Sequence, residues 1–200
     1  MTWDADTAAR AEAIIARYPE RRSAVMPLLY LAMARDGRLT DNGMRQVAML
    51  AGMTPAQVHS VASFYSMYKR EVGDHVVSVC RSVSCHLLGA EDLLAAVVDE
   101  SGVRPGETGE ITVEAVECVG ACGGAPAVQV DYELLEGVTP ARARALCRWL
   151  IDTHPRVVMG DEMQERFGGR RSFDWGPAEK VGAVGPVPAF EPYGTTGGGA

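Results

Sequence analysis

The sequence lacks long hydrophobic runs, an excess of basic residues and the glycine motifs of nucleotide-binding folds. No stretch approaches the roughly 18 consecutive apolar residues of a membrane span, so no such span is expected. A net charge of −7 and a pI near 5.1 disfavour nucleic acid as a partner, because phosphate binding needs a basic face. Neither a G-x-G-x-x-G segment after a predicted strand nor a phosphate loop is present in the sequence, so we expect no nucleotide or flavin site on this chain.

The opening residues, MTWDADTAARAEA, also lack the basic-then-apolar order of a secretory signal, so a cytoplasmic location is expected. In that compartment the five cysteines should stay reduced unless a metal binds them. The sequence contains no Cys-x-x-Cys, which disfavours thioredoxin-type disulfide exchange.

Residues 1–72 are predicted to form a helical N-terminal domain without chemistry of its own. The clearest helix start is Thr54, which can cap a helix, followed by Pro55 in the first turn and Gln57, which can reach back to the cap. The expected helices cover residues 5–17, residues 24–35, the segment between Thr40 and Gly52, and a segment from Thr54.

Residues 73–155 change pattern and predict an α/β domain. β-branched and alternating apolar runs indicate strands, and turn residues such as Pro105-Gly106 separate them. The resulting order β-α-β-β-α suggests a small α/β sandwich similar in size to a thioredoxin core. The predicted elements are strands at 75–79, 111–116, 127–130 and 132–135 and helices at 88–100 and 139–152.

Residues 156–200 are predicted to be an extended C-terminal tail. Ten glycines and four prolines fall within residues 160–200 without any period, which is typical of disordered segments. The alternative is an arm that lies along a partner protein. The segment contains more aromatic residues than a purely solvated tail needs: Phe173, Trp175, Phe190 and Tyr193.

Four cysteines fall into two pairs, each directly after a predicted strand. Cys80 and Cys85 follow the first strand, and Cys118 and Cys122 follow the second. If these strands are parallel or adjacent, both loops leave the same end of the sheet and the four thiols converge. A set of four thiolates is typical of zinc or of an iron–sulfur cluster.

The spacing favours a [2Fe–2S] cluster over zinc. Each of two irons takes two thiolates, which suits two pairs on two loops, whereas structural zinc knuckles usually staple domains too small to fold alone. The second loop, from Cys118 to Pro126, consists almost entirely of small residues, so its backbone N–H groups can approach sulfur closely. Structural zinc and unrelated cysteines remain the alternatives, and a plain glycine turn is the alternative for the loop.

The fifth cysteine and the histidines are not expected to bind metal. Cys147 lies among apolar residues of the last predicted helix, where a small buried side chain is expected. Among the four histidines, only His86 is next to a candidate ligand, where an indirect role is a hypothesis. Ser82 and Ser84 can supply hydrogen bonds, although a surface position explains them equally well.

Over about residues 10–152, the chain resembles the 24-kDa-type [2Fe–2S] subunit of NADH:quinone oxidoreductase, respiratory complex I. The similarity lies in the Phe64-Tyr65-Ser66-Met67 helix end and in the two loops, Val79-Cys80-x4-Cys85-His86-x-x-Gly89 and Cys118-Val119-Gly120-Ala121-Cys122-Gly123-Gly124-Ala125-Pro126. The resemblance implies a helical part, a thioredoxin-like ferredoxin domain, and one [2Fe–2S] cluster near a flavin on a neighbouring subunit.

The implied function is single-electron transfer within a larger enzyme, because NADH donates a hydride and one cluster accepts one electron. FMN and NADH would then bind a partner subunit, with further peripheral-arm subunits of complex I nearby, on the cytoplasmic face of the membrane. Members of the same family also serve NAD-linked hydrogenases and formate dehydrogenases, so the terminal acceptor is open between quinone, protons and carbon dioxide. A structural zinc-binding interaction protein is the alternative of another class.

Overall fold

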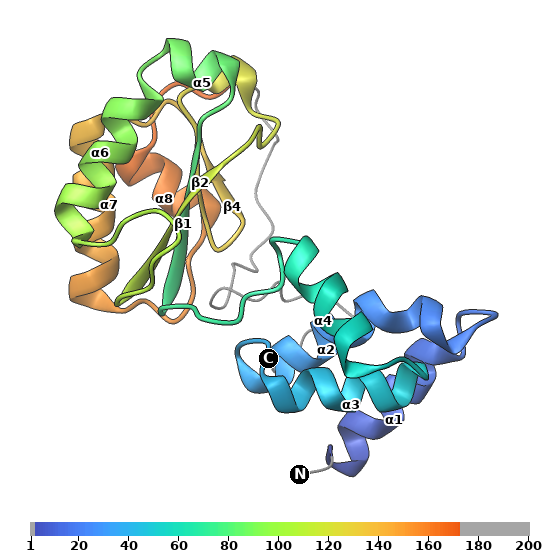
Figure 1. The fold of residues 1–200 in the computed structure, drawn as a ribbon. Coiled ribbons are helices and arrows are strands. Elements are labelled where there is room, and N and C mark those ends of the chain that lie inside the picture. Colours follow the sequence, from blue (N-terminus) through green and yellow to red (C-terminus); the bar gives the residue numbers. More distant parts are fainter. Residues whose placement is uncertain (1–2, 173–200) are drawn as a thin grey trace. The chain divides into compact units, whose positions relative to one another are not determined.

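The computed structural model describes residues 3–172, which divide into two compact units. Residues 3–71 belong to the first unit and residues 72–172 to the second. Helices come first, drawn blue to teal in Figure 1, and a mixed four-stranded sheet with helices follows, drawn green to orange. The predicted α/β class is confirmed. No helix within residues 3–172 is both long and apolar enough to cross a membrane.

The first unit is helical, and side chains cap three of its helix starts. The side chains of Asp4, Thr40 and Thr54 each accept a hydrogen bond from a backbone N–H of the first turn. The Gln57 side chain accepts from the Thr54 N–H at 2.9 Å, which completes the predicted capping box. The elements are α1 (Ala5–Ile15), the 3-10 turn η1 (Arg21–Ala24), α2 (Val25–Asp36), α3 (Asp41–Ala51) and α4 (Pro55–Phe64).

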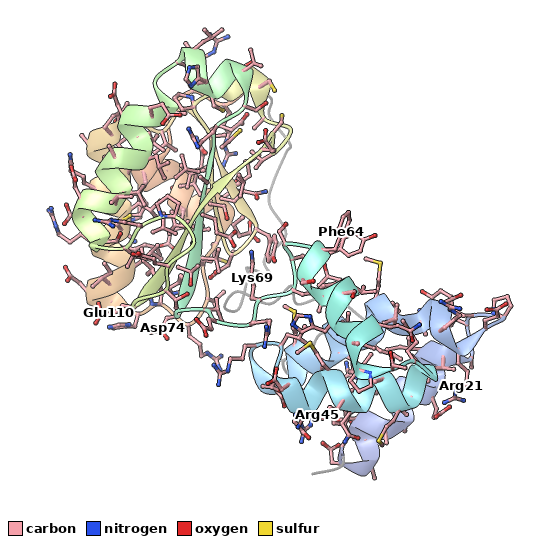
Figure 2. All side chains as sticks on the ribbon, viewed as in Figure 1. Arg21, Arg45, Phe64, Lys69, Asp74 and Glu110 are labelled. Atoms are coloured by element: carbon pink, nitrogen blue, oxygen red, sulfur yellow. The ribbon has the colours of Figure 1, made fainter. Side chains whose placement is uncertain are left out.

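Apolar side chains fill the interior of the helical unit. Leu28, Leu29 and Val47 are fully buried, and Tyr68 donates from its hydroxyl to the Met26 carbonyl. Phe64, at the end of α4, is 79% exposed and projects away from the helix (Figure 2). The buried residues Leu28, Leu29 and Val47 belong to one apolar core, which stabilises this unit.

The second unit combines the sheet with four α-helices and a short 3-10 turn. Its strands are β1 (His75–Cys80), β2 (Ile111–Val116), β3 (Val128–Val130) and β4 (Glu133–Leu135). Its helices are α5 (Val83–Leu87), α6 (Ala90–Ser101), α7 (Pro140–Thr153) and α8 (Gly160–Phe167), and the 3-10 turn is η2 (Cys122–Gly124). The cysteine loops contain two of these elements, α5 and η2, which the sequence pattern did not predict.

The sheet mixes parallel and antiparallel pairing and packs against helices on one face. The strand order is β2-β1-β3-β4; β1 pairs with β2 in parallel and with β3 in antiparallel, and β3 and β4 form a hairpin. Val77 lies opposite Val113 on one side and Val130 on the other, so all three point to the same face. That face packs against α6, α7 and α8 in a single apolar core (Figure 1).

Helix α8 corrects the prediction of an extended tail from residue 156. Met163 and Phe167, one turn apart, are buried in the core, and the Phe167 ring lies 5.5 Å from that of Trp149. The remaining residues of α8 are mostly polar, and a helix this short is stabilised by tertiary packing rather than by local preference. The predicted arm, with Trp175 and the aromatic residues after it, lies outside the described residues.

Candidate functional site

Both cysteine loops leave the same end of the sheet. Strands β1 and β2 run parallel, and the last residues of the two strands, Cys80 and Val116, are register partners. The Arg81 N–H then donates to the Val116 carbonyl at 2.9 Å, so the loops separate only beyond this point. These strands are both parallel and adjacent, the condition expected to bring the loops together, so both pairs of cysteines lie at this end of the sheet.

The first loop holds its cysteines on regular structure. Cys80 is the last residue of β1, and its N–H donates to the Ala127 carbonyl at 3.1 Å. Cys85 lies on α5, and both cysteines are almost completely buried. This pair is therefore positioned by a strand and a helix.

The second loop presents its cysteines at the surface. Cys118 and Cys122 are both exposed, and their sulfurs lie 3.4 Å apart. The Gly120 N–H donates to the Cys118 sulfur at 3.4 Å, and Gly120 has a φ of +86°, a conformation that favours glycine. The pair depends on the backbone conformation of an irregular segment.

Small side chains surround the two thiols of the first loop. Ala90, Ala121 and Ala127 are buried in one cluster with the two cysteines of the first loop. Three partly buried apolar residues pack against this cluster: Val119, Ala125 and Leu134. The small size of most of these side chains lets backbone groups come near sulfur, as expected from the sequence of the second loop.

The ionisation of the thiols shows that they interact across the two loops. Burial, followed by the sulfurs of Cys80 and Cys122, raises the pKa of Cys85 to about 11. The Gly120 N–H lowers the pKa of Cys118, whereas Cys118 and more weakly Cys80 raise the pKa of Cys122. Cys122 is therefore close enough to the first loop to exchange electrostatic effects with both of its cysteines.

The donor set fits a cluster that needs two thiolates at each of two irons. The four sulfurs are soft ligands arranged as two pairs: the first pair is buried among small alanine side chains, and the second is exposed at the same end of the sheet. Within residues 3–172, no three histidine, cysteine or acidic side chains converge tightly enough to hold a single metal ion.

The remaining candidates from the sequence differ in their relation to the four thiols. Cys147 is fully buried in the core, as predicted, and burial raises its pKa to about 12. His86 is exposed and faces Glu91 at 3.5 Å, a carboxylate that also binds Arg81. The Ser84 side chain hydrogen-bonds to Cys122 and opposes the rise in the pKa of that thiol, so its hydroxyl contributes to the site.

An exposed apolar edge beside the first loop was not anticipated. Val83 and Leu87 on α5 and Leu88 directly after it are 73%, 76% and 60% exposed. The sequence contains a signal, since Leu87-Leu88 follows Cys85-His86 directly, but a leucine pair in that position more often begins a buried helix. These three residues are called the apolar edge below.

Comparison with known proteins identifies the family. Residues 11–150, more than two thirds of the chain, match the model of the thioredoxin-like [2Fe–2S] ferredoxins. The chain belongs to the thioredoxin-like [2Fe–2S] ferredoxin family. The resemblance drawn from the two cysteine loops is thereby confirmed, and the family implies a [2Fe–2S] cluster.

Relatives of this chain are named as subunits of NADH-quinone oxidoreductase. The chain is 40% identical over 151 residues to an NADH-quinone oxidoreductase subunit of Mycobacterium tuberculosis, covering 74% of this chain and 60% of that protein. It is 41% identical over 142 residues to "NADH-quinone oxidoreductase subunit 2" of Thermus thermophilus, covering 68% and 78%. The chain thus spans less than two thirds of the length of its mycobacterial relative.

Solved structures show the same fold at lower sequence identity. A crystal structure of an NAD+-reducing [NiFe]-hydrogenase in the H2-reduced state matches with a TM-score of 0.59 and 19% identity, over 70% of this chain and 24% of that one. The air-oxidised state matches with a TM-score of 0.57 and 20% identity, over 64% and 23%. At this identity the likeness concerns the fold alone.

Proposed function

We propose that this chain is an electron-transfer subunit of an NADH:quinone oxidoreductase, with one [2Fe–2S] cluster bound by Cys80, Cys85, Cys118 and Cys122. The observation that carries the proposal is the parallel pairing of β1 and β2, which places both cysteine pairs of a [2Fe–2S] ferredoxin at one end of the sheet. Relatives that are about 40% identical over most of this chain are subunits of that enzyme.

Two features of the α/β unit distinguish a redox cluster bound by these four cysteines from a structural zinc site. The α/β unit has an extensive apolar core of its own, so it has no need of a metal to fold. The Gly120 N–H donates to the Cys118 sulfur, a contact that stabilises negative charge on thiolate and raises the reduction potential of a bound cluster. Both features favour a redox role over a structural one.

When bound, the cluster supplies one-electron transfer, and the residues of this chain control which partner can exchange electrons with it. Cys80 and Cys85 are shielded by protein, whereas Cys118 and Cys122 face outward. The apolar edge lies on the same loop as Cys85, and exposed apolar residues next to a redox site are typical of a docking surface. We infer that the flavin- and NADH-binding subunit contacts this end of the sheet.

The wider assignment follows the same relatives. We infer that residues 1–72 are a helical domain and that residues 73–155 form the main part of the thioredoxin-like ferredoxin domain, to whose core α8 adds Met163 and Phe167. FMN and NADH would bind the partner, and the other peripheral-arm subunits of complex I would place this chain at the cytoplasmic face of the membrane. An NAD-linked hydrogenase or formate dehydrogenase is an alternative assembly with the same electron-transfer role.

Metal analysis tests the cofactor. Protein purified without oxygen should contain about two irons and two acid-labile sulfides per chain, because each iron takes two thiolates. It should be brown and give an electron spin resonance signal when reduced. Zinc in place of iron, without labile sulfide, would disprove the proposal.

Reduction by NADH tests the partner. The isolated chain should not be reduced by NADH, whereas addition of the flavoprotein should allow reduction, followed through the resonance signal of the reduced cluster. The extent depends on the difference in potential, since about 59 mV changes a one-electron equilibrium tenfold. Reduction of the flavin-free chain by NADH would reveal a nucleotide site on this chain and contradict the proposal.

A further inference from the structure

The chain returns from α8 to the second cysteine loop. Residues 168–172, called the strap below, follow α8 directly and end beside Gly123. The family model matches residues 11–150, so the strap lies outside the matched part of the chain. Its contacts with the loop are therefore a feature that the family assignment does not explain.

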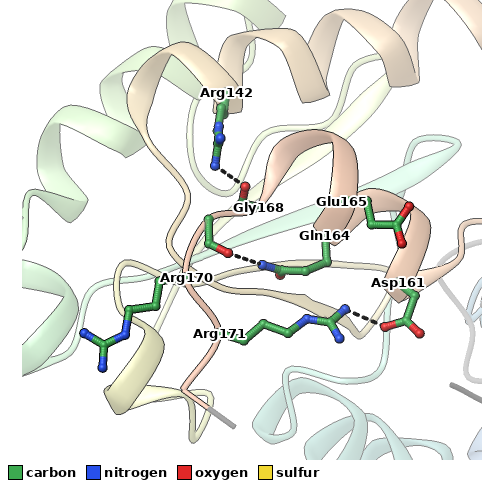
Figure 3. Close-up of a pocket in the computed structure, with 8 residues that line it drawn as sticks. Arg142, Asp161, Gln164, Glu165, Gly168, Arg170 and Arg171 are labelled. Carbon is green, nitrogen blue, oxygen red and sulfur yellow. Dashed lines mark hydrogen bonds and ion pairs between the residues drawn. The ribbon is translucent and has the colours of Figure 1, made fainter. Parts of the chain in front are cut away.

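Hydrogen bonds fasten the start of the strap to the end of the β3–β4 hairpin. The Gln164 side chain accepts from the Glu136 N–H at 2.8 Å and donates to the carbonyls of Glu136 and Gly169, each at 3.1 Å. The Gly169 N–H also donates to the Glu136 carbonyl at 2.7 Å. Figure 3 shows Gln164 and Arg142 reaching the strap, Arg142 through the Gly168 carbonyl.

The end of the strap provides hydrogen bonds to a buried carboxylate. Glu136 is only 3% exposed, and both oxygens of its carboxylate accept hydrogen bonds from Ser172. The Ser172 N–H donates to one oxygen at 3.2 Å, and the Ser172 hydroxyl donates to the other. A buried carboxylate without hydrogen-bond donors is energetically costly. Loss of the Ser172 contacts would therefore leave Glu136 unsatisfied, so these hydrogen bonds stabilise the position of the strap.

The same groups pack against the second cysteine loop. The Gly137 N–H donates to the Gly124 carbonyl at 2.6 Å, and a methyl group on Gly124 would overlap the Glu136 side chain. A methyl group on Gly123 would lie 2.8 Å from Cβ of Ser172, closer than real side-chain contacts allow. Gly123 is the residue after Cys122, so the strap limits where that cysteine can lie.

We propose that the strap is a positioning device for the second cysteine loop, with Ser172 and Glu136 acting on Cys122 through Gly123 and Gly124. The inference rests on the proposed function, in which Cys122 is a ligand of the cluster. Indirect partners of this kind orient metal ligands and affect both the retention and the electronic properties of the metal. The first loop needs no such support, because β1 and α5 already hold its cysteines.

A size exchange at the contact tests the proposal in the full-length chain. Gly123→Ala should clash with Ser172 and shift the loop, whereas Ser172→Gly removes the clashing Cβ and leaves Cα of residue 172 at 3.8 Å from the added methyl group, an ordinary contact. We expect Gly123→Ala to shorten the half-life of the cluster in the presence of an iron chelator roughly tenfold. The double variant Gly123→Ala, Ser172→Gly should recover part of that loss, because it relieves the clash but also lacks the Ser172 hydroxyl.

Two further measurements separate positioning from general stability. The resonance spectrum of the reduced cluster should change in Gly123→Ala and return toward the wild type in the double variant, while the unfolding midpoint of the chain changes little. Ser172→Ala keeps Cβ and removes only the hydroxyl donor, so it should shorten the cluster half-life by a few-fold. Ser101→Ala is the matched control, since this serine hydrogen-bonds at the end of α6, away from both loops.

The outcomes are distinct. Equal cluster loss in Gly123→Ala and in the double variant, or an unchanged cluster in both Gly123→Ala and Ser172→Ala, would overturn the positioning role and leave the proposed function intact. A wild-type chain that holds no iron–sulfur cluster would overturn the proposed function and this inference with it.

Discussion

The two cysteine loops leave neighbouring parallel strands, yet they position their thiols in different ways. Cys80 and Cys85 lie on a strand and a helix and are buried. Cys118 and Cys122 are exposed and lie on a segment whose conformation depends on glycines and on contacts from the β3–β4 hairpin and the strap. The first pair is held by regular secondary structure, whereas the second pair lies on an irregular segment held by glycine conformations and by contacts from the hairpin and the strap.

The loops also differ in electrostatics. Burial raises the pKa of Cys85, while the Gly120 N–H lowers that of Cys118. Of these two thiols, Cys118 is therefore expected to be the more reactive in the metal-free chain. A metal ion must displace the thiol protons, and the cost is greater at Cys85 than at Cys118.

The largest effect should follow loss of a ligand. Serine in place of Cys80, Cys85, Cys118 or Cys122 should abolish or severely destabilise the cluster, because hydroxyl oxygen is a poor substitute for thiolate at iron. Iron content and visible absorbance measure the effect. Cys147→Ser is the control: it should retain the cluster and lower the free energy of unfolding by about 1–3 kcal/mol, since it buries a hydroxyl in the core. Bleaching by Cys147→Ser would contradict the ligand assignment.

Thiol reactivity should separate the two loops in the metal-free chain. At neutral pH we expect Cys118 to be alkylated at least about tenfold faster than Cys85, because its pKa is lowered and its sulfur is exposed. Its rate should therefore persist at a pH below the ordinary thiol range, while Cys85, with a pKa of about 11, should react appreciably only in alkaline solution. Mass spectrometry of timed samples measures both rates. Equal rates would mean that the metal-free loops lack the described conformation.

Substitution of Gly120 in the second loop should have a smaller effect on the cluster than loss of a ligand. Gly120→Ala places a side chain at φ +86°, which costs about 1–2 kcal/mol, and displaces the N–H that donates to Cys118. We expect a lower reduction potential, measured by redox titration of the resonance signal, because the donor stabilises the more negative reduced form.

Gly102→Ala is the matched control for Gly120→Ala. Gly102 ends α6 at φ +69°, and a methyl group there, as at Gly120, meets no atom within 4 Å. Gly102→Ala should lower the free energy of unfolding by a similar amount and leave the reduction potential of the cluster unchanged. Equal shifts in both variants would show that the Gly120 N–H does not affect the cluster.

The smallest effect concerns docking through the first loop. Leu87→Gln should weaken binding of the flavoprotein by about 1 kcal/mol, several-fold in affinity, and leave the cluster spectrum unchanged. Titration calorimetry with the partner subunit measures it. Met49→Gln, on the exposed face of α3, changes a similarly exposed apolar residue and should leave that affinity unchanged. If both variants bind equally well, the apolar edge is not the docking surface.

Local pattern and packing agree in the parts of the molecule that the sequence predicted. The capping box at Thr54 and Gln57 formed as predicted, and the strands predicted at 75–79 and 111–116 are His75–Cys80 and Ile111–Val116 in the structure. Helix α8 was missed because its apolar positions are few, and its glycine-rich surroundings suggested an extended chain. The short helix α5 was missed because no side chain caps its start and the sequence pattern placed the helix start at Leu88.

The sequence alone predicted which thiols lie together, since each pair of cysteines directly follows a predicted strand and parallel or adjacent strands bring both loops to one end of the sheet. Only the tertiary structure decided which pair is buried, what shapes the second loop and where the strap lies. Ser172 and Glu136 are separated by 36 residues along the chain and meet through a hydrogen bond that no periodicity or spacing encodes. Contacts of that kind arise when α8 and the β3–β4 hairpin pack on one core, because packing rather than local preference sets their positions.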